Sequence, residues 1–253
     1  MLLSALAHAG MTLLTKRAQD RLVFRGLSLL FVAILLTPWI AFHPIPTWEV
    51  WRFLLLSAVT IWAFNMLMIA AFERGNMNLA YPVMRGSAPS LAALSAYIFL
   101  GEAINGWQMA GLAVATFALV GFAWPEKDGA PKLQTLLFAL AASTMTASYT
   151  VIDAAGVRAS GDFLTYTGWF FALSAITIMA TAWVRRRGDL VRLMKQEARP
   201  AATSMMFNLT TYGLALYAYS IAPVAPMAAL RETSIIFGAI LAVVLIGSEY
   251  RTT

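Results

Sequence analysis

Long apolar runs fill most of this 253-residue chain and leave few folds open to it. Eight of them reach about 20 residues, the length that an α-helix needs to cross the hydrocarbon core of a bilayer. They cover residues 22–42, 50–72, 78–100, 103–124, 133–156, 162–184, 200–221 and 224–247. A ninth run, residues 2–15, is shorter and is interpreted as a helix whose first turn is missing. The runs predict an all-α polytopic membrane protein.

The composition excludes several other classes of protein. Hydrophobic residues make up 60% of the chain and charged residues only 12%, whereas a soluble domain carries about 25% charged residues. The chain has no Cys and only two His, so thiolate sites are impossible and a His-based zinc site is disfavoured. It also lacks a G-x-x-x-x-G-K phosphate loop, which disfavours ATP-driven transport. No metal and no other cofactor is therefore predicted.

The positive residues are distributed unevenly about the predicted spans. Of the 18 Lys and Arg residues, 14 fall in segments on one side, two (Arg52 and Arg158) fall on the opposite side, and two lie within spans. The positive-inside rule then places segments 16–25 and 185–199 in the cytoplasm and the start of the chain outside. The net charge of +6 thus serves orientation, and nucleic acid is not a predicted partner.

Internal similarity divides the chain into two halves. LLSALAHAGMT (residues 2–12) aligns without gaps with LLFALAASTMT (residues 136–146), and seven of the eleven positions are identical. AYPVMRGSAPS (80–90) aligns with PMAALRETSII (226–236), which places Arg85 on Arg231 at an offset of 146 residues. Gly101 and Gly247 share that offset. We expect a first repeat at residues 1–124 with five helices and a second at residues 133–253 with four, the final helix being missing.

An odd number of spans in the repeated unit has a topological consequence. The second copy enters the membrane in the opposite direction, which gives the inverted-topology repeat of many secondary transporters. In such folds the binding site lies near the bilayer midplane, between the two halves.

Two arginines inside apolar runs are the leading site candidates. Arg85 and Arg231 each lie about eight residues into a run, about 12 Å from its start at 1.5 Å per residue. Inserting a charged side chain at the centre of a membrane helix costs about 2.5 to 3.5 kcal/mol on insertion scales, so the presence of each arginine requires an explanation. The two guanidinium groups can bind a carboxylate or phosphate between the halves. The alternative is a structural role, in which each arginine binds helix carbonyls or a neighbouring glutamate.

Other polar residues complete the candidate set. Glu232 follows Arg231 directly and is expected either to carry a proton or to pair with a neighbouring residue. Asp153 can line the cavity together with Tyr149, one turn before it, although a solvated position near the end of its run is favoured. His8 can bind substrate or a proton. The candidate substrate-binding residues are thus Arg85, Arg231, Glu232, Tyr149, Asp153 and His8.

Glycine and proline indicate where two of the helices end or break. Glu102 follows Gly101, and Glu249 comes after Gly247, which is typical of a helix end with a solvated acid. Pro82 and Pro89 in one run, and Pro223 and Pro226 at the start of the other, predict that the helices at 78–100 and 224–247 are kinked or interrupted.

A family resemblance agrees with these features. AFERGNMNLAYPVMRGSAPSLAALSAYIFLGE (71–102), the following WQMAGLAVATFALVGF, and APVAPMAALRETSIIFGAILAVVLIGSE (222–249) resemble the EamA-type branch of the drug/metabolite transporter superfamily. The resemblance implies a ten-helix fold of two five-helix halves that moves small metabolites or drugs, often by proton-linked export. It also implies that both chain ends are cytoplasmic, in contrast to the charge count.

The predicted function is secondary transport of a small organic solute by alternating access, in a bacterial inner (plasma) membrane. The expected partners are the solute, the lipid bilayer and, through the family, protons, and the sequence is compatible with a homo-oligomer. Two alternatives remain: an intramembrane enzyme acting on a lipid or prenyl substrate, and a membrane assembly factor without flux. The enzyme should carry an acidic metal-binding pair or a His/Asp cluster, whereas the sequence offers isolated acids.

Overall fold

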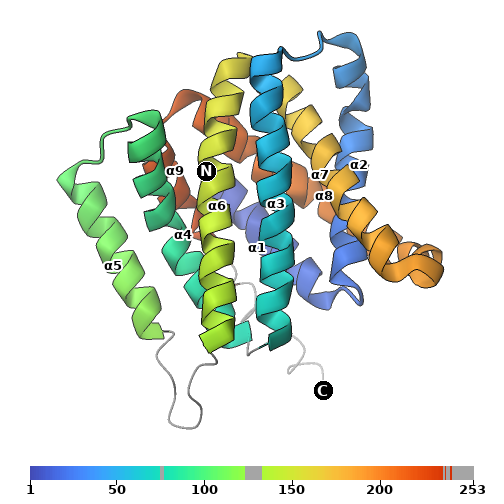
Figure 1. Ribbon diagram of the computed structural model, residues 1–253, viewed down its shortest axis with the longest axis horizontal. Helices are drawn as coiled ribbons and strands as arrows, with labels where there is room; N and C mark the ends of the chain where they lie inside the picture. The colour runs from blue at the N-terminus through green and yellow to red at the C-terminus, as the bar shows by residue number, and fades with distance from the viewer. Residues whose placement is uncertain (75–76, 123–132, 236, 238–239, 241–253) are drawn as a thin grey trace.

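The computed structural model describes residues 1–74, 77–122, 133–235, 237 and 240, and these residues form α-helices joined by short connections (Figure 1). The α-helices are α1 (Leu2–Arg17), α2 (Arg21–Phe42), α3 (Trp48–Arg74), α4 (Met77–Leu100), α5 (Gly106–Phe122), α6 (Leu133–Ser160), α7 (Phe163–Arg186), α8 (Leu190–Ile221) and α9 (Val224–Arg231). A single 3₁₀ turn, η1 (Arg187–Asp189), separates α7 from α8. The prediction of an all-α protein is confirmed.

Most helices lie where the apolar runs predict them. The helix predicted at 200–221 begins at Leu190, and Pro200 lies inside it. In the run at 224–247, α9 ends at Arg231, a turn follows at residues 232–233, and the described residues 234, 235, 237 and 240 are helical again, so the predicted interruption of this helix is confirmed. The helix at 78–100, predicted to be kinked or interrupted, is not interrupted, since α4 runs from residue 77 to 100 without a break. Gly247 and Glu249 lie outside the described residues.

Polar caps and glycines set the ends of several helices. Asp20 caps α2, where its Oδ1 accepts hydrogen bonds from the backbone N–H groups of Leu22 and Val23, both at 3.0 Å. Asp162 caps α7 in the same way, accepting from the N–H of Leu164 at 3.0 Å. Gly101 follows α4 with a φ of 66°, in the left-handed region that glycine adopts without a steric penalty.

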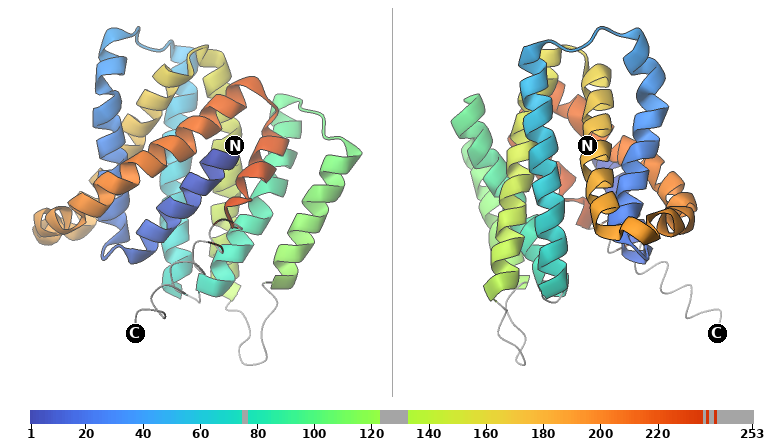
Figure 2. Two further views of the ribbon diagram at one scale, coloured as in Figure 1. Left: turned by 180° about the vertical axis from the view of Figure 1, so that it is seen from behind. Right: turned by 45° about the vertical axis from the view of Figure 1, so that its right-hand side comes forward.

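The helices pack as two groups that face each other. Helix α6 packs between α3 and α4, and α5 lies against α4. In the other group α2 packs against both α7 and α8, while α1 lies along α8. Figure 2 shows the first group on one side of the molecule and the second on the other. Contacts of α2 with α7 and of α3 with α7 form part of the buried core that holds the molecule together.

The outer surface has the apolar character that a bilayer requires. Within the described part of the chain, five segments are long and apolar enough to cross a membrane: Arg21–Phe42, Trp48–Ala71, Val83–Leu100, Leu133–Ser160 and Phe163–Ile221, the last of which contains α7 and α8. Large apolar side chains such as Val59 on α3 and Phe117 on α5 are exposed on the outside. Such faces fit lipid, because hydrocarbon is a favourable surrounding for them.

The two ends of the helix bundle differ in charge. One end, here called the basic end, holds residues 17–25 and 185–199, where α1 meets α2 and α7 meets α8. The other, here called the opposite end, holds the connections at 43–47, 101–105, 161–162 and 222–223. The basic end is at the bottom of Figure 1 and the opposite end is at the top.

Candidate functional site

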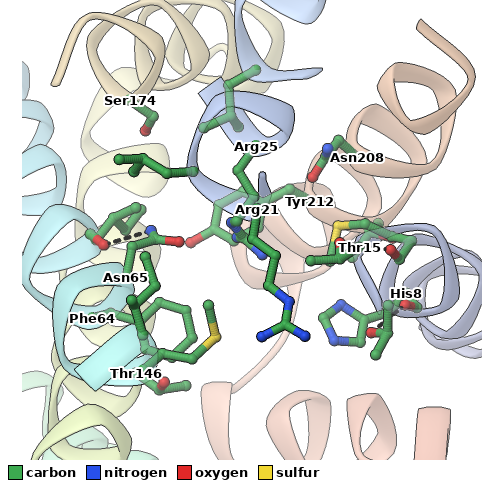
Figure 3. Close-up of a pocket in the computed structure, with 18 of the residues that line it drawn as sticks. His8, Thr15, Arg21, Arg25, Phe64, Asn65, Thr146, Ser174, Asn208 and Tyr212 are labelled. Atoms are coloured by element: carbon green, nitrogen blue, oxygen red, sulfur yellow. Dashed lines mark hydrogen bonds between the residues drawn. The ribbon is translucent and has the colours of Figure 1, made fainter. Parts of the chain in front are cut away.

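A cavity of about 480 Å³ lies between the two helix groups. Its described lining residues come from α1, α2, α3, α4, α6, α7, α8 and α9 and from the connection between α1 and α2. Figure 3 shows His8 and Thr15 reaching it from α1, Arg21 and Arg25 from α2, and Asn208 and Tyr212 from α8. A volume of this size falls within the range of small-molecule sites, about 300 to 1,000 Å³.

The cavity opens at the basic end. Arg21, Arg185 and Arg186 line it there and are exposed, so the cavity continues to the surface. From this entrance it extends into the middle of the bundle, where Tyr149 of α6 and Arg231 of α9 contribute to its wall. Among the described residues, none of the connections at the opposite end takes part in the lining.

The opposite end is held closed by an acidic residue and an arginine. The Glu102 carboxylate accepts a hydrogen bond from the backbone N–H of Val224, the first residue of α9, at 2.6 Å. It also forms an ion pair with Arg158 at 2.8 Å. Arg158 in turn donates to the carbonyl oxygens of Tyr219 and Ala222 at the end of α8, at 2.8 and 2.9 Å. These contacts tie α6, the α4–α5 connection and the junction of α8 with α9 together.

Positive charge dominates the interior of the cavity. The guanidinium-bearing residues Arg25, Arg85 and Arg231 line it together with His8. Arg231 has only 5% of its surface exposed. The Nε atoms of Arg25 and Arg231 are buried and have no hydrogen-bond partner among the described residues.

Arg85 has partners from both halves of the chain. It forms an ion pair with Glu232 at 3.3 Å, and its guanidinium also contacts the His8 ring nitrogen Nε2. Glu232 itself does not line the cavity. Of the two alternatives expected for Glu232, the structure agrees with pairing to a neighbouring residue, because its carboxylate forms the ion pair with Arg85 of α4.

Asp153 is buried beside the cavity. It is fully buried on α6, and its carboxylate accepts hydrogen bonds from the hydroxyls of Tyr166 at 2.9 Å and Tyr212 at 2.5 Å. The expected solvated position of Asp153 is therefore wrong. Tyr212 and Tyr149 line the cavity, and the Tyr212 ring stacks on Phe170 with centroids 4.3 Å apart. This stacking fixes the hydroxyl that connects Asp153 to the cavity wall.

The remaining wall combines amide groups with apolar side chains. Asn65 on α3 donates to the carbonyl of Ile61 at 2.8 Å, while its Oδ1 atom is buried without a partner among the described residues. Asn208 on α8 donates to the Ser28 hydroxyl at 2.5 Å. Apolar side chains occupy much of the rest of the lining: Met11, Leu29, Ile61, Phe64, Met68, Ile69, Met84, Phe170 and Phe171. In the described part of the chain, no three His, Asp or Glu side chains come together to hold a metal ion.

The structure brings four of the six sequence candidates to the cavity. His8, Arg85, Tyr149 and Arg231 line it, whereas Glu232 and Asp153 lie behind the wall, each bound to a residue that lines it. Glu102, expected to be a solvated helix end, instead caps α9 and pairs with an arginine.

Sequence reasoning missed one central residue, Arg25. It was counted with the flanking charges of segment 16–25, but α2 begins at Arg21 and carries Arg25 one turn into the bundle. The available signal was its position within the run at 22–42, where a charge is as unusual as Arg85 is in its own run. Asn65 and Asn208 were also missed, because single amides in apolar helices carry no pattern.

Comparison with known families agrees with this architecture. The model of the EamA-like transporter family matches residues 1–124, and a comparison with curated proteins gives no match. The matched segment contains α1 to α5 and so provides His8, Arg25, Asn65 and Arg85 of the cavity. Through residues 1–124 the chain belongs to the EamA-like transporter family of the drug/metabolite transporter superfamily, whose members are membrane transporters.

Proposed function

We propose that this protein is a secondary transporter that carries a small organic solute through the central cavity by alternating access. The observation that carries the proposal is the cavity itself, which is open at the basic end and closed at the opposite end by Glu102 and Arg158. By the positive-inside rule the basic end faces the cytoplasm, so the described conformation is open inwards. The proposed location is the bacterial inner membrane.

The packing of the helices supports an origin in two inverted repeats. If α1 to α4 correspond to α6 to α9, then exchanging the halves turns the contact of α3 with α6 into that of α8 with α1, and both contacts are present. The contacts of α2 with α7 and of α4 with α9 map onto themselves. The caps Asp20 and Asp162 occupy corresponding places at the starts of α2 and α7. Such symmetry gives a protein two related conformations, each open on one side.

The outward-open conformation requires the opposite end to separate. In the proposed cycle, Glu102 releases the start of α9, and Arg158 releases the end of α8. Closure at the basic end would bring the group of α3, α4 and α6 nearer to the group of α1, α2, α7 and α8, because the cavity lies between these two groups. The solute would remain at the middle of the bundle while access changes sides.

For coupling to protons, the structure favours Asp153 over Glu232. The charge of Glu232 is balanced by Arg85, whereas Asp153 has no ion-pair partner among the described residues. A proton on Asp153 would remove a buried charge that otherwise accepts hydrogen bonds from the hydroxyl groups of Tyr166 and Tyr212. Tyr212 gives that carboxylate a connection to the cavity, so binding of the solute and of a proton can influence each other.

Solute counterflow in proteoliposomes tests the transport proposal. We expect the purified protein to exchange at least one solute of a metabolite library, measured with and without a pH gradient. The Thr146→Trp variant fills the cavity and should abolish exchange, because Thr146 is a buried lining residue of α6. The matched control is Thr144→Trp, two residues away on the exposed face of the same helix.

The same assay separates the rival functions. An intramembrane enzyme would convert a lipid or prenyl substrate without exchanging solutes, and an assembly factor would do neither. Equal exchange by the Thr146→Trp and Thr144→Trp proteins would contradict a route through the cavity.

A further inference from the structure

The cavity carries more positive charge than its own acids balance. Among the described residues, six arginines line it: Arg21, Arg25, Arg85, Arg185, Arg186 and Arg231. Asp20 is the only acid in the described lining, and it pairs with Arg186, while Arg85 pairs with Glu232 behind the wall. Within the described part of the chain, Arg25 and Arg231 form neither an ion pair nor a side-chain hydrogen bond, although their Nε atoms are buried.

We propose that Arg25 and Arg231 bind the carboxylate or phosphate group of an organic anion, and that this anion is the transported solute. The inference rests on the proposed transport function and assigns the chemical class of its solute. Burying a guanidinium group without a counter-charge is unfavourable, and an anion in the cavity removes that cost. Each guanidinium is a planar fork that can donate two parallel hydrogen bonds to a carboxylate or phosphate.

The two arginines reach the cavity from opposite directions. Arg25 lies one turn into α2, which starts at the basic end. Arg231 ends α9, seven residues from Val224 at the opposite end, or about 11 Å at 1.5 Å per residue. Because a transport cycle moves these helices relative to each other, an anion bound between them would become accessible from each side of the membrane in turn. Arg231 is set deeper than Arg25, which is the more exposed of the two.

The rest of the cavity lining indicates the chemistry of the uncharged part of the anion, here called its body. Apolar and aromatic side chains, among them Phe64 and Met68 of α3 and Phe171 of α7, line the cavity together with the amide of Asn65. A volume of about 480 Å³ accommodates an organic molecule considerably larger than a free inorganic anion. The site therefore fits an acid with an aromatic or aliphatic body better than inorganic phosphate.

Binding of a matched pair of probes tests this inference. Phenylacetate and its neutral isostere 2-phenylacetamide differ mainly in charge, and phenyl phosphate and inorganic phosphate test the phosphate group with and without an apolar body. We expect the 253-residue protein in detergent to be stabilised against heat by phenylacetate or phenyl phosphate. The apparent Kd of the amide should be larger than that of the acid by about tenfold or more. Inorganic phosphate alone should have little effect on the thermal stability.

Substitutions then locate the effect at the two arginines. Arg25→Gln and Arg231→Gln should each weaken binding of the acid about tenfold or more, with little change for the amide. Arg192→Gln is the control, because Arg192 is an exposed arginine that pairs with Asp189 outside the cavity. If Arg231→Gln does not fold, Arg231→Lys keeps the charge, removes the planar fork, and should still weaken binding of the acid.

Two results would overturn the inference. The first is equal stabilisation by the acid and the amide. The second is unchanged binding of the acid in both the Arg25 and the Arg231 variants. If the counterflow assay detects exchange of neutral solutes only, the transport proposal stands and the assignment of an anion is wrong.

Discussion

Replacing Glu102 by Gln should move the protein towards the outward-open conformation. In the described conformation the carboxylate accepts from the Val224 N–H at 2.6 Å and pairs with Arg158 at 2.8 Å. Gln keeps an acceptor for Val224 but loses the charge in both interactions. A hydrogen bond to a charged group contributes about 1.5 to 3 kcal/mol, against about 1 kcal/mol for a neutral one.

The size of the effect follows from these contacts. Without the charge on residue 102, the hydrogen bond from the Val224 N–H contributes about 1 kcal/mol less to the described conformation. Loss of the ion pair with Arg158, whose side chain is 33% exposed, costs up to about 1 kcal/mol more after solvent screening. A total of about 1 to 2 kcal/mol changes the ratio of the two conformations about five- to thirtyfold, if the outward-open state makes neither contact.

Access of a thiol reagent measures that ratio. The chain has no Cys, so a single Thr12→Cys substitution places one thiol in the cavity wall. In oriented vesicles, Glu102→Gln should raise the rate of labelling by an impermeant maleimide from the opposite end about five- to thirtyfold. Asp189→Asn, which removes an exposed ion pair at the basic end, should leave the rate unchanged. An unchanged rate in Glu102→Gln would refute the assignment of Glu102 as a closing contact.

Two further substitutions separate stability from coupling. Glu232→Gln should lower the free energy of unfolding by about 3 kcal/mol in chemical denaturation, because the charge of Arg85, whose side chain is 11% exposed, then stays buried without this carboxylate. Adding Arg85→Gln to the same protein should restore part of that stability. If the double variant is no more stable than Glu232→Gln alone, the ion pair between Arg85 and Glu232 does not account for the loss of stability. Asp153→Asn should abolish accumulation of solute driven by a pH gradient while solute exchange survives, as measured in proteoliposomes. Coupled accumulation that persists in Asp153→Asn would direct the search for the proton carrier elsewhere.

Helices of this protein are predictable because the bilayer requires them. An apolar run of about 20 residues has to bond its backbone internally, so its position in the sequence fixes the helix. The start of α8 was missed because residues 190–199 are amphipathic: Leu190 and Glu197 are buried, whereas Arg192 and Lys195 are exposed. The buried carboxylate of Glu197 accepts from the backbone N–H of Gln19 at 2.7 Å, a contact across 178 residues that no local pattern indicates.

The candidate site was predictable only in part, for a related reason. A charge in the middle of an apolar run is visible in the sequence, and it identified Arg85 and Arg231. Which residues pair depends on the packing of one half against the other, so the contact of Arg85 with Glu232 was not predictable. Likewise, the two tyrosines that bind Asp153 come from α7 and α8. They are recognisable as its partners only when the helices are assembled.

The most direct test of transport through the cavity combines chemical modification with flux. In proteoliposomes containing the Thr12→Cys protein, an impermeant maleimide applied at the basic end should react with the cavity thiol and stop solute counterflow. Saturating solute should slow that reaction, because the solute and the reagent occupy the same space. Counterflow that continues at its original rate after complete modification, with no protection by the solute, would contradict the account.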